Sequence, residues 1–278
     1  MSQHLVWLRT DLRILDNPAL FSAAESGQVT ALFLLTPEQW QIHGIAPRKI
    51  AFILRSLDAV SEQLAERGIE TKIILSSRFE DAPQKVLEVA ASIQATSVFW
   101  NDEIAVDEQR RDDAVARTLS EAGINVERHH AFTSLPPGSV RKPDASPYSV
   151  FTPFKKRWIS ICVDRGIHTF PKPESQGPKA PATKAPDTVG DVAKSLGSEN
   201  WPAGKSEGLK LLDRFTDAAI LEYDNQRDLP DLEGTSKLSP HLAAGTLSAN
   251  HCIKAAYACN GHRLSGGNPN IDTWISEL

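Results

Sequence analysis

Residues 233–239 (EGTSKLS) combine a glycine, three hydroxyl side chains and a lysine immediately before a short expected helix. The hydroxyls belong to Thr235, Ser236 and Ser239, and the cation is Lys237. A helix N-terminus presents free N–H donors and a partial positive charge, so a lysine there is mildly unfavourable unless an anion is bound. The spacing points to a phosphate-binding loop. A well-capped loop with a surface lysine is the alternative that the spacing alone leaves open.

Aromatic and basic side chains supply two further candidates. Tyr223 lies on the helix expected before this loop, where it either packs against a bound ring or fills the core. Residues 151–158 (FTPFKKRW) set three basic side chains among three aromatic ones. That mixture is typical of phosphate contacts beside stacking rings, and equally of a solvated basic turn over a small apolar cluster.

Conventional catalytic groups are missing from the sequence. The three cysteines show no C-x-x-C spacing, and no histidine pair has the i,i+4 spacing of a helical metal site, so we predict no metal site. No G-x-S-x-G elbow occurs, and the turn after the first expected strand (RTDLR) lacks the G-x-G-x-x-G fingerprint. The sequence therefore favours a bound organic cofactor that performs the difficult step.

The first part of the chain alternates short apolar runs with helical patterns. The runs at 4–8, 29–35, 71–75, 97–100 and 124–127 are mostly continuous, as in parallel strands covered on both faces. Helical periodicity falls between them at 47–67, 81–94 and 107–122. This alternation predicts an α/β domain, a doubly wound parallel sheet of about five strands, over residues 1–131. Trp7, Arg9, Asp11 and Arg13 follow one strand end, and 101–103 another, where ligands of such sheets sit.

The rest of the chain divides into a connection and an all-helical part. Residues 132–206 are predicted to form an inter-domain linker, and 171–206, rich in Pro, Gly, Ala, Ser and Lys, are expected to bury little. From 207 to 278 we expect only helices, at 207–225, 240–244, 249–260 and from near Asp272. Ser239 and Ser248 are the expected N-caps, and Gly245 the expected left-handed residue after a helix.

Composition restricts the class of protein only loosely. The net charge of −5 over 278 residues shows no overall attraction to nucleic acid, yet a local basic groove on an acidic protein can still bind phosphates. No apolar run approaches the roughly 20 residues of a membrane span, and the N-terminal residues lack a signal peptide's apolar core. We therefore expect a cytoplasmic protein without a membrane partner.

Four segments in order carry a resemblance to a known family: LVWLRTDLRILDNPAL, TPFKKRW, YDNQRDLPDLEGTSKLSPHLAAGTLS and the final WISEL. Together they resemble the DNA photolyase/cryptochrome family, and within it the bacterial class I cyclobutane pyrimidine dimer photolyases with a folate antenna. The resemblance runs from residue 3 to the last residue. It implies an α/β domain for a light-harvesting chromophore and a helical domain for FAD.

The function implied by this resemblance is light-driven DNA repair. In the family, excited reduced flavin donates an electron to a flipped-out pyrimidine dimer, which splits and returns the electron. Damaged DNA is then the partner, the protein acts as a monomer, and its residues supply positioning and electrostatics. A cryptochrome-like photoreceptor without repair activity, and a nucleotide-binding α/β module without light chemistry, are the alternatives.

The resemblance also assigns roles to individual residues. Tyr223, Thr235, Ser236, Lys237, Leu238 and Ser239 match positions that contact the FAD phosphates and ribityl chain. Lys237 stands where many relatives have arginine, and the loss of the planar fork is expected to loosen the grip on the diphosphate. Trp274 matches a flavin-contacting tryptophan. Glu277 matches a carboxylate that touches the dimer and is the expected catalytic residue.

For the antenna, His43, Asp107 and Glu108 match positions that hold methenyltetrahydrofolate in folate-type relatives. Asp107 replaces a more frequent asparagine and adds a negative charge facing an anionic ligand. An acidic cap on the helix 107–122 explains Asp107 and Glu108 equally well.

The helix beginning near Asp272 stops within two turns, whereas the family continues well beyond WISEL with the rest of the flavin cavity. We therefore expect a C-terminally truncated chain. The helices at 207–225 and 249–260 are expected to expose unpartnered apolar faces. This chain alone is expected neither to bind FAD stably nor to repair DNA.

Overall fold

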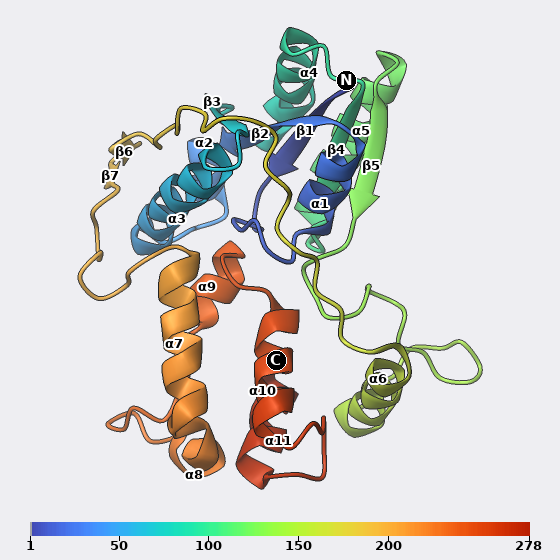
Figure 1. The fold of residues 1–278 in the computed structure, drawn as a ribbon, viewed down its shortest axis with the longest axis vertical. Coiled ribbons are helices and arrows are strands. Elements are labelled where there is room, and N and C mark those ends of the chain that lie inside the picture. The colour runs from blue at the N-terminus through green and yellow to red at the C-terminus, as the bar shows by residue number, and fades with distance from the viewer. Residues whose placement is uncertain (1) are drawn as a thin grey trace.

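The computed structural model describes residues 2–278, and its N-terminal half is built on one parallel sheet. The strands are β1 (Gln3–Leu8), β2 (Gln28–Leu35), β3 (Glu70–Leu75), β4 (Ser97–Asn101) and β5 (Asn125–His129). They pair in parallel in the order β3-β2-β1-β4-β5 (Figure 1). The predicted doubly wound α/β fold is confirmed, and the order of the sheet reverses between β1 and β4.

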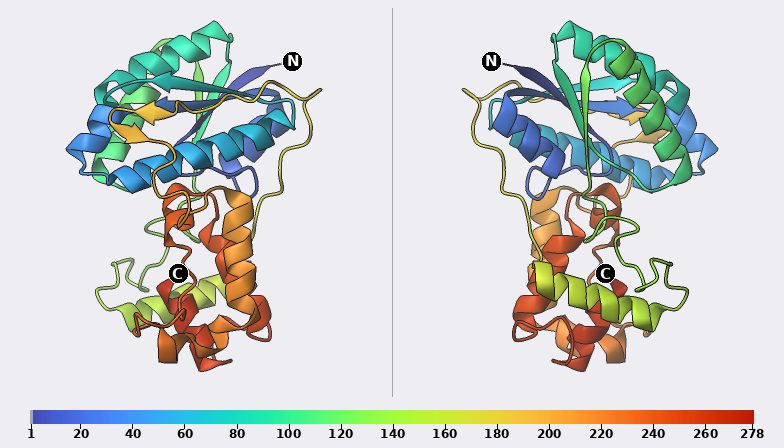
Figure 2. Two further views of the ribbon diagram at one scale, coloured as in Figure 1. Left: turned by 90° about the vertical axis from the view of Figure 1, so that its left-hand side faces the viewer. Right: turned by 90° about the vertical axis from the view of Figure 1, so that its right-hand side faces the viewer.

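Helices cover both faces of the sheet because its strands are apolar on both sides (Figure 2). α1 (Pro18–Ser26) and α3 (Pro47–Ala65) pack on one face, where Val6, Leu8 and Phe33 are buried. α4 (Ala82–Ser92) and α5 (Val106–Glu121) pack on the other, over Leu5 and Trp7. Alternate residues of β1 thus belong to two separate cores.

Two helices of this unit were not predicted, namely α1 and α2 (Pro37–Ile42). α1 begins with a cap that can be read from the sequence: the Asn17 side chain accepts a hydrogen bond from the Leu20 backbone N–H, and Pro18 occupies the first turn. A short 3₁₀ turn, η1 (Phe79–Asp81), precedes α4.

The connection between the two units is anchored more firmly than expected. It contains α6 (Phe151–Arg165) and a small antiparallel pair, β6 (Thr188–Val189) and β7 (Val192–Ala193). The expectation that 171–206 bury little is wrong at Ala185 and Val189, which are 3% and 8% exposed and join the core beneath α3. The Asp58 carboxylate accepts the Ala185 backbone N–H at 2.6 Å, which pins this segment to α3.

Every regular element from residue 205 to 278 is a helix, as predicted. Its elements are α7 (Lys205–Asp217), η2 (Ala219–Glu222), α8 (Tyr223–Gln226), α9 (Ser239–Ala244), α10 (Ala249–Cys259) and α11 (Pro269–Glu277). The helix expected to run to 225 ends at Asp217, because Ala218 leaves the helical region at φ −147°. α11 begins at Pro269, capped by Asn268, rather than near Asp272.

The expected caps are only partly correct. Ser248 accepts the His251 backbone N–H, and Gly245 adopts φ +70°, both as predicted. Ser239 is wrong as an N-cap: it is the first helical residue, Leu238 holds the cap position, and no side chain caps this helix. The hydroxyl of Ser239 therefore stays available at the surface.

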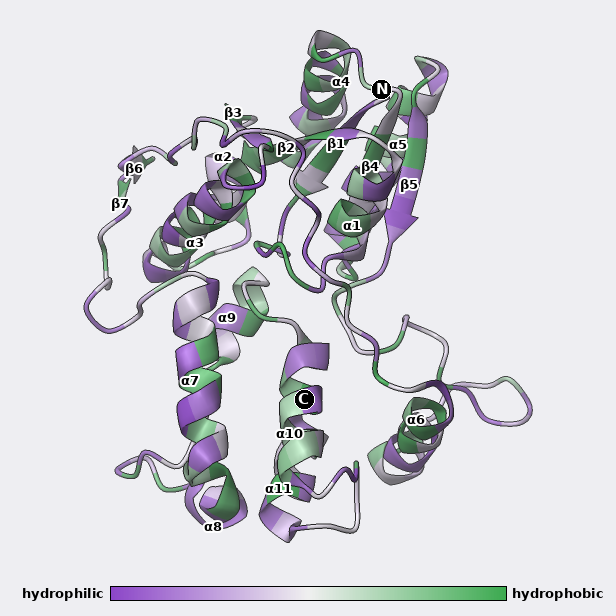
Figure 3. Ribbon diagram, in the orientation of Figure 1, coloured by the Kyte–Doolittle hydropathy of each residue, from purple (hydrophilic) through white to green (hydrophobic). Residues whose placement is uncertain are grey.

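α7, α10 and α11 pack against one another, contrary to the expectation of unpartnered apolar faces. Leu212 and Phe215 of α7, Cys252 of α10 and Trp274 of α11 share one buried cluster. Figure 3 shows α7 banded by hydrophilic and hydrophobic residues, as expected of a helix with one buried face. None of the helices within residues 2–278 combines the length and the apolar character that crossing a bilayer requires.

Candidate functional site

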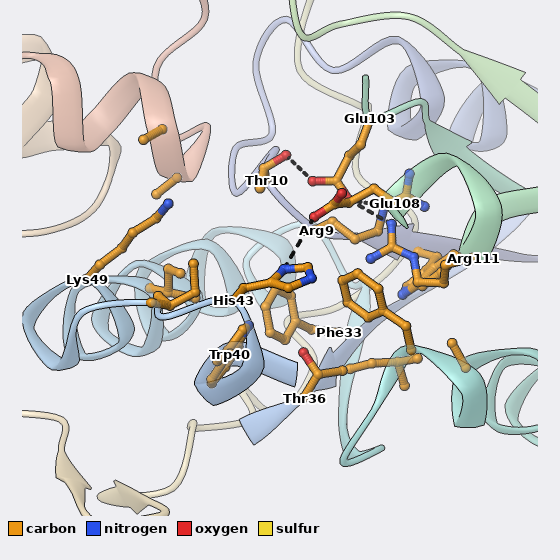
Figure 4. Close-up of a pocket in the computed structure, with 18 residues that line it drawn as sticks. Arg9, Thr10, Phe33, Thr36, Trp40, His43, Lys49, Glu103, Glu108 and Arg111 are labelled. Atoms are coloured by element: carbon orange, nitrogen blue, oxygen red, sulfur yellow. Dashed lines mark hydrogen bonds and ion pairs between the residues drawn. The ribbon is translucent and has the colours of Figure 1, made fainter. Parts of the chain in front are cut away.

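A pocket opens at the carboxyl ends of β1 and β2, beside the point where the sheet order reverses (Figure 4). This is the usual ligand position in open α/β sheets. Its volume is about 140 Å³, below the roughly 300–1,000 Å³ of most ligand pockets, so a larger ligand would be only partly enclosed. Its polar lining residues are Arg9, Thr10, Thr36, His43, Lys49, Glu103, Glu108 and Arg111.

The floor of this pocket, which we call the sheet-end pocket, is a buried network of two arginines and two carboxylates. Arg9 Nη2 lies 3.1 Å from Asp112 Oδ2, and Arg111 Nη2 lies 2.7 Å from Asp112 Oδ1 and 2.6 Å from Glu103 Oε2. Arg9 also donates to the Asn101 carbonyl at 2.5 Å. Burial alone would raise the pKa of Glu103, but the Arg111 and Arg9 charges outweigh it, and that pKa is lowered. The network is therefore held ionised and charge-balanced.

Three buried donors of this floor make no hydrogen bond within residues 2–278: Trp7 Nε1, Arg9 Nη1 and Arg9 Nε, the last of which lies 3.9 Å from Glu103 Oε2. The Arg9 guanidinium carbon lies 4.3 Å from the centre of the Trp7 ring. Leaving such buried donors unpaired costs roughly 1–3 kcal/mol each. A ligand that brings carbonyl or ring-nitrogen acceptors into the pocket would remove this cost.

The structure brings His43, Asp107 and Glu108, the residues predicted to hold an antenna chromophore, together at the mouth of the sheet-end pocket. The His43 ring lies 3.7 Å from Asp107 Oδ2 and 3.9 Å from Glu108 Oε1, and it meets the Phe79 ring edge to face. His43 and Glu108 line the pocket. Asp107 is more exposed than Glu108, and its carboxylate also pairs with the exposed Arg110 at 3.3 Å.

The loop 235–239, which we call the hydroxyl loop, lies at the start of α9. Its hydroxyls at Thr235, Ser236 and Ser239 have no hydrogen-bond partner in the part of the chain that the structure describes. Lys237 adopts φ +53° and forms an ion pair with Glu233. Leu238 is 1% exposed and anchors the loop in the helical core. The arrangement offers one cation and three free hydroxyls to an anion.

Tyr223, Trp274 and Glu277 come together from α8 and α11. Both rings pack against Phe215, that of Tyr223 at 5.7 Å and that of Trp274 at 4.9 Å between centres. Glu277 is exposed and lies 2.6 Å from Arg227 Nη1. Burial, followed by the Glu277 charge, raises the pKa of Tyr223, although Arg227 opposes this. The two rings thus face protein neighbours, and only the carboxylate reaches the surface.

Comparison with known proteins identifies the family of this chain. The family model for DNA photolyase matches residues 4–174, which is more than half of the chain. This chain belongs to the DNA photolyase family. The deoxyribodipyrimidine photo-lyase of Vibrio cholerae is 35% identical over 99% of this chain and 59% of its own length. That of Escherichia coli is 34% identical over 100% of this chain and 58% of its own length.

A solved photolyase structure agrees with these alignments. The class III photolyase from Agrobacterium tumefaciens superposes with a TM-score of 0.78 at 26% identity, covering 100% of this chain and 57% of that one. The chain therefore spans rather more than half the length of these photolyase relatives.

Sequence reasoning overlooked Arg111, which lines the sheet-end pocket, and Asp112, which lies in the buried network beneath it. Both lie within the charged run DEQRRDD, which is indistinguishable from a solvated helix surface. In the structure they are 7% and 0% exposed, because α5 turns this side toward Arg9. The only available signal is that Arg9 and Glu103 follow the ends of two strands. Charged side chains buried there need partners of opposite charge nearby.

Proposed function

We propose that this chain provides the antenna unit and the first part of the flavin unit of a deoxyribodipyrimidine photolyase, an enzyme of light-driven DNA repair. The observation that carries the proposal is the alignment of essentially the whole chain with deoxyribodipyrimidine photo-lyases at 34–35% identity. We divide the chain into an antenna domain at 1–131, a linker at 132–206 and a helical FAD-binding domain from 207.

For FAD, the hydroxyl loop is the proposed diphosphate site. Thr235, Ser236 and Ser239 have free hydroxyls for the phosphate oxygens, and Lys237 can exchange its partner Glu233 for a phosphate, since that pair is solvent-exposed and weak. Leu238 fixes the loop in the core. Tyr223 and Trp274, whose rings pack against Phe215, are the proposed ring contacts beneath the flavin. The bound flavin supplies light-driven electron transfer, and these residues bind and orient it.

For the antenna chromophore we propose methenyltetrahydrofolate at the sheet-end pocket. The partnerless donors of Trp7 and Arg9 suit the acceptor atoms of a pterin ring. His43 and Glu108 lie at the mouth, where the rest of a partly enclosed ligand would extend. The Asp107 carboxylate, shared between His43 and Arg110, weakens the fit to the ligand's glutamate end.

For the substrate we propose pyrimidine dimers in DNA, bound by a monomer. Glu277 is the proposed catalytic residue, and its exposed carboxylate is held by Arg227. Lys156 and Arg157 on α6 are the proposed phosphate contacts. Lys155 is less free, since its ammonium donates to the Ser276 hydroxyl and joins α6 to α11.

A repair assay tests this function directly. This chain, extended by the C-terminal part of the Escherichia coli photo-lyase that it does not cover, is mixed with FAD, dithionite and an oligonucleotide containing a thymine dimer. Dimer loss is followed by the recovery of thymine absorbance under blue light. We expect light-dependent recovery that stays absent in the dark. Blue-light absorption by bound flavin without dimer loss would instead support a cryptochrome-like photoreceptor. No flavin binding by the extended protein would refute both.

A further inference from the structure

One wall of the sheet-end pocket comes from the helical unit rather than from the sheet. Ala243 and Ala244, the last two residues of α9, line the pocket together with His43 and Lys49 of the sheet unit. α9 is only six residues long and directly follows the hydroxyl loop. Figures 1 and 2 show it between the sheet and the other helices. The position of this one short helix therefore determines both the width of the pocket and the place of the hydroxyl loop.

Arg13 holds this junction by donating to three backbone carbonyls from separate segments. Its Nε donates to Asp16 at 2.9 Å, its Nη1 to Gly245 at 2.9 Å, and its Nη2 to Ala131 at 3.2 Å. Arg13 is buried, with only 4% of its surface exposed. A planar guanidinium can reach three carbonyls at fixed angles, which a lysine ammonium on a flexible stem cannot reproduce.

Gly245 lets the two units approach this closely. It ends α9 at φ +70°, and a Cβ at this position would lie 1.9 Å from the Thr10 carbonyl oxygen. The Leu12 backbone N–H donates to the Ala244 carbonyl at 3.3 Å. The end of α9 is thus in backbone contact with the β1–α1 turn, and Thr10 of that turn also lines the sheet-end pocket.

We propose that Arg13 is a positioning residue that clamps α9 against the β1–α1 turn, closing the sheet-end pocket and fixing the hydroxyl loop relative to it. It acts through the Gly245 carbonyl and touches no ligand. The identification of the pocket's ligand as an antenna chromophore rests on the proposed function, whereas the clamp itself does not.

Arg55 provides a matched control. It too donates to three backbone carbonyls, those of Lys194, Leu196 and Trp201, but these lie in the linker and not in α9. The variants are Arg13→Gln, Arg13→Lys and Arg55→Gln, each checked for native helix content by circular dichroism. Cys259 is exposed while Cys162 and Cys252 are buried, so spin labels on Cys259 and on an introduced Glu121→Cys report the distance between the units.

The first readout is the distribution of distances between the two spin labels. The second is the affinity for two ligand probes, methenyltetrahydrofolate and flavin mononucleotide (FMN), measured by fluorescence titration. We expect Arg13→Gln to broaden the distribution and to weaken binding of the better probe at least tenfold. Arg13→Lys should resemble it, and Arg55→Gln should leave both readouts unchanged.

An unchanged distance distribution in Arg13→Gln, or full restoration of the wild-type distribution by Arg13→Lys, would overturn the proposal. If the wild-type protein binds neither probe, the antenna assignment fails, and the distance measurement alone decides the role of Arg13.

Discussion

The buried network beneath the sheet-end pocket predicts a large difference between two neighbouring aspartates. Asp112 is fully buried and accepts three N–H bonds, from Arg9 Nη2 at 3.1 Å and from Arg111 Nε and Nη2 at 3.0 and 2.7 Å. Asp113, the next residue, pairs with Arg128 at 2.7 Å on the exposed side of α5. Substitution of each by asparagine preserves side-chain shape and removes one negative charge.

In Asp112→Asn, the new amide N–H₂ faces an arginine donor, and the two buried arginines share a single remaining carboxylate, that of Glu103. Removing one partner of a buried ion pair typically costs about 3–5 kcal/mol, because a buried charge is left uncompensated. For a protein of this size that corresponds to a fall in Tm of roughly 10 °C. Asp113→Asn removes an exposed pair, whose contribution is about 0–1 kcal/mol.

Urea unfolding of both variants and the wild type is monitored by circular dichroism. FMN and methenyltetrahydrofolate are then titrated into the folded proteins. Asp112→Asn should be the less stable variant and should bind either probe more weakly, since Arg9 and Arg111 lose their common anchor. Equal stability of the two variants would show that the network is not desolvated, and the account of the pocket floor would be wrong.

Three further predictions concern the helical unit. Burial lowers the pKa of His241 to about 4, so the unfolded chain takes up a proton at this residue before the folded chain does as pH falls. We expect the stability present above about pH 6.5 to decline by about 3 kcal/mol toward pH 4, and His241→Gln to remove this part of the pH dependence in urea titrations. In the extended protein of the repair assay, Lys237→Arg should tighten FAD binding several-fold in fluorescence titrations, because a guanidinium can bind the diphosphate with two N–H donors; unchanged or weaker binding would place the diphosphate away from the hydroxyl loop. In the same extended protein, Glu277→Gln should lower dimer repair at least tenfold with unchanged FAD affinity, whereas Glu222→Gln on the neighbouring turn should not; full repair by Glu277→Gln would contradict its catalytic role.

Much of the α/β unit was predictable because its signals are local. Mostly continuous apolar runs mark β1 to β4, and the alternating Ile124 and Val126 mark β5. Pro47 at the start of α3 marks a helix with one buried face. The missing helix α1 also had a local signal, the pair Asn17-Pro18, which is a good cap followed by the residue best suited to a first turn. The break at Ala218 had none, since no glycine or proline stands there and the change of direction comes from packing of Phe215 and Ile220 into one core.

The sites show the same division. The hydroxyl loop could be found from residue types alone, and the grouping of His43 with Glu108 from the resemblance. Asp112 could not be found, because a carboxylate on a charged helix has no feature in sequence that distinguishes burial from exposure. The three carbonyls that Arg13 joins come from positions 16, 131 and 245, and backbone acceptors leave no trace in residue identity.

The two arginines of the β1–α1 turn have different roles at the sheet-end pocket. Arg9 turns into the sheet and is neutralised by carboxylates of the same unit, so it shapes the pocket floor. Arg13 points toward the helical unit and donates to the Gly245 carbonyl at the end of α9, so it positions one wall of the pocket. An aspartate or glutamate at position 245 could also pair with Arg13, but its carboxylate would sit on a longer and more mobile side chain. The clash of a Cβ with the Thr10 carbonyl excludes any side chain at this position. Backbone carbonyls are the acceptors that allow contact this close, which is why the junction depends on a glycine and on a guanidinium rather than on an ion pair.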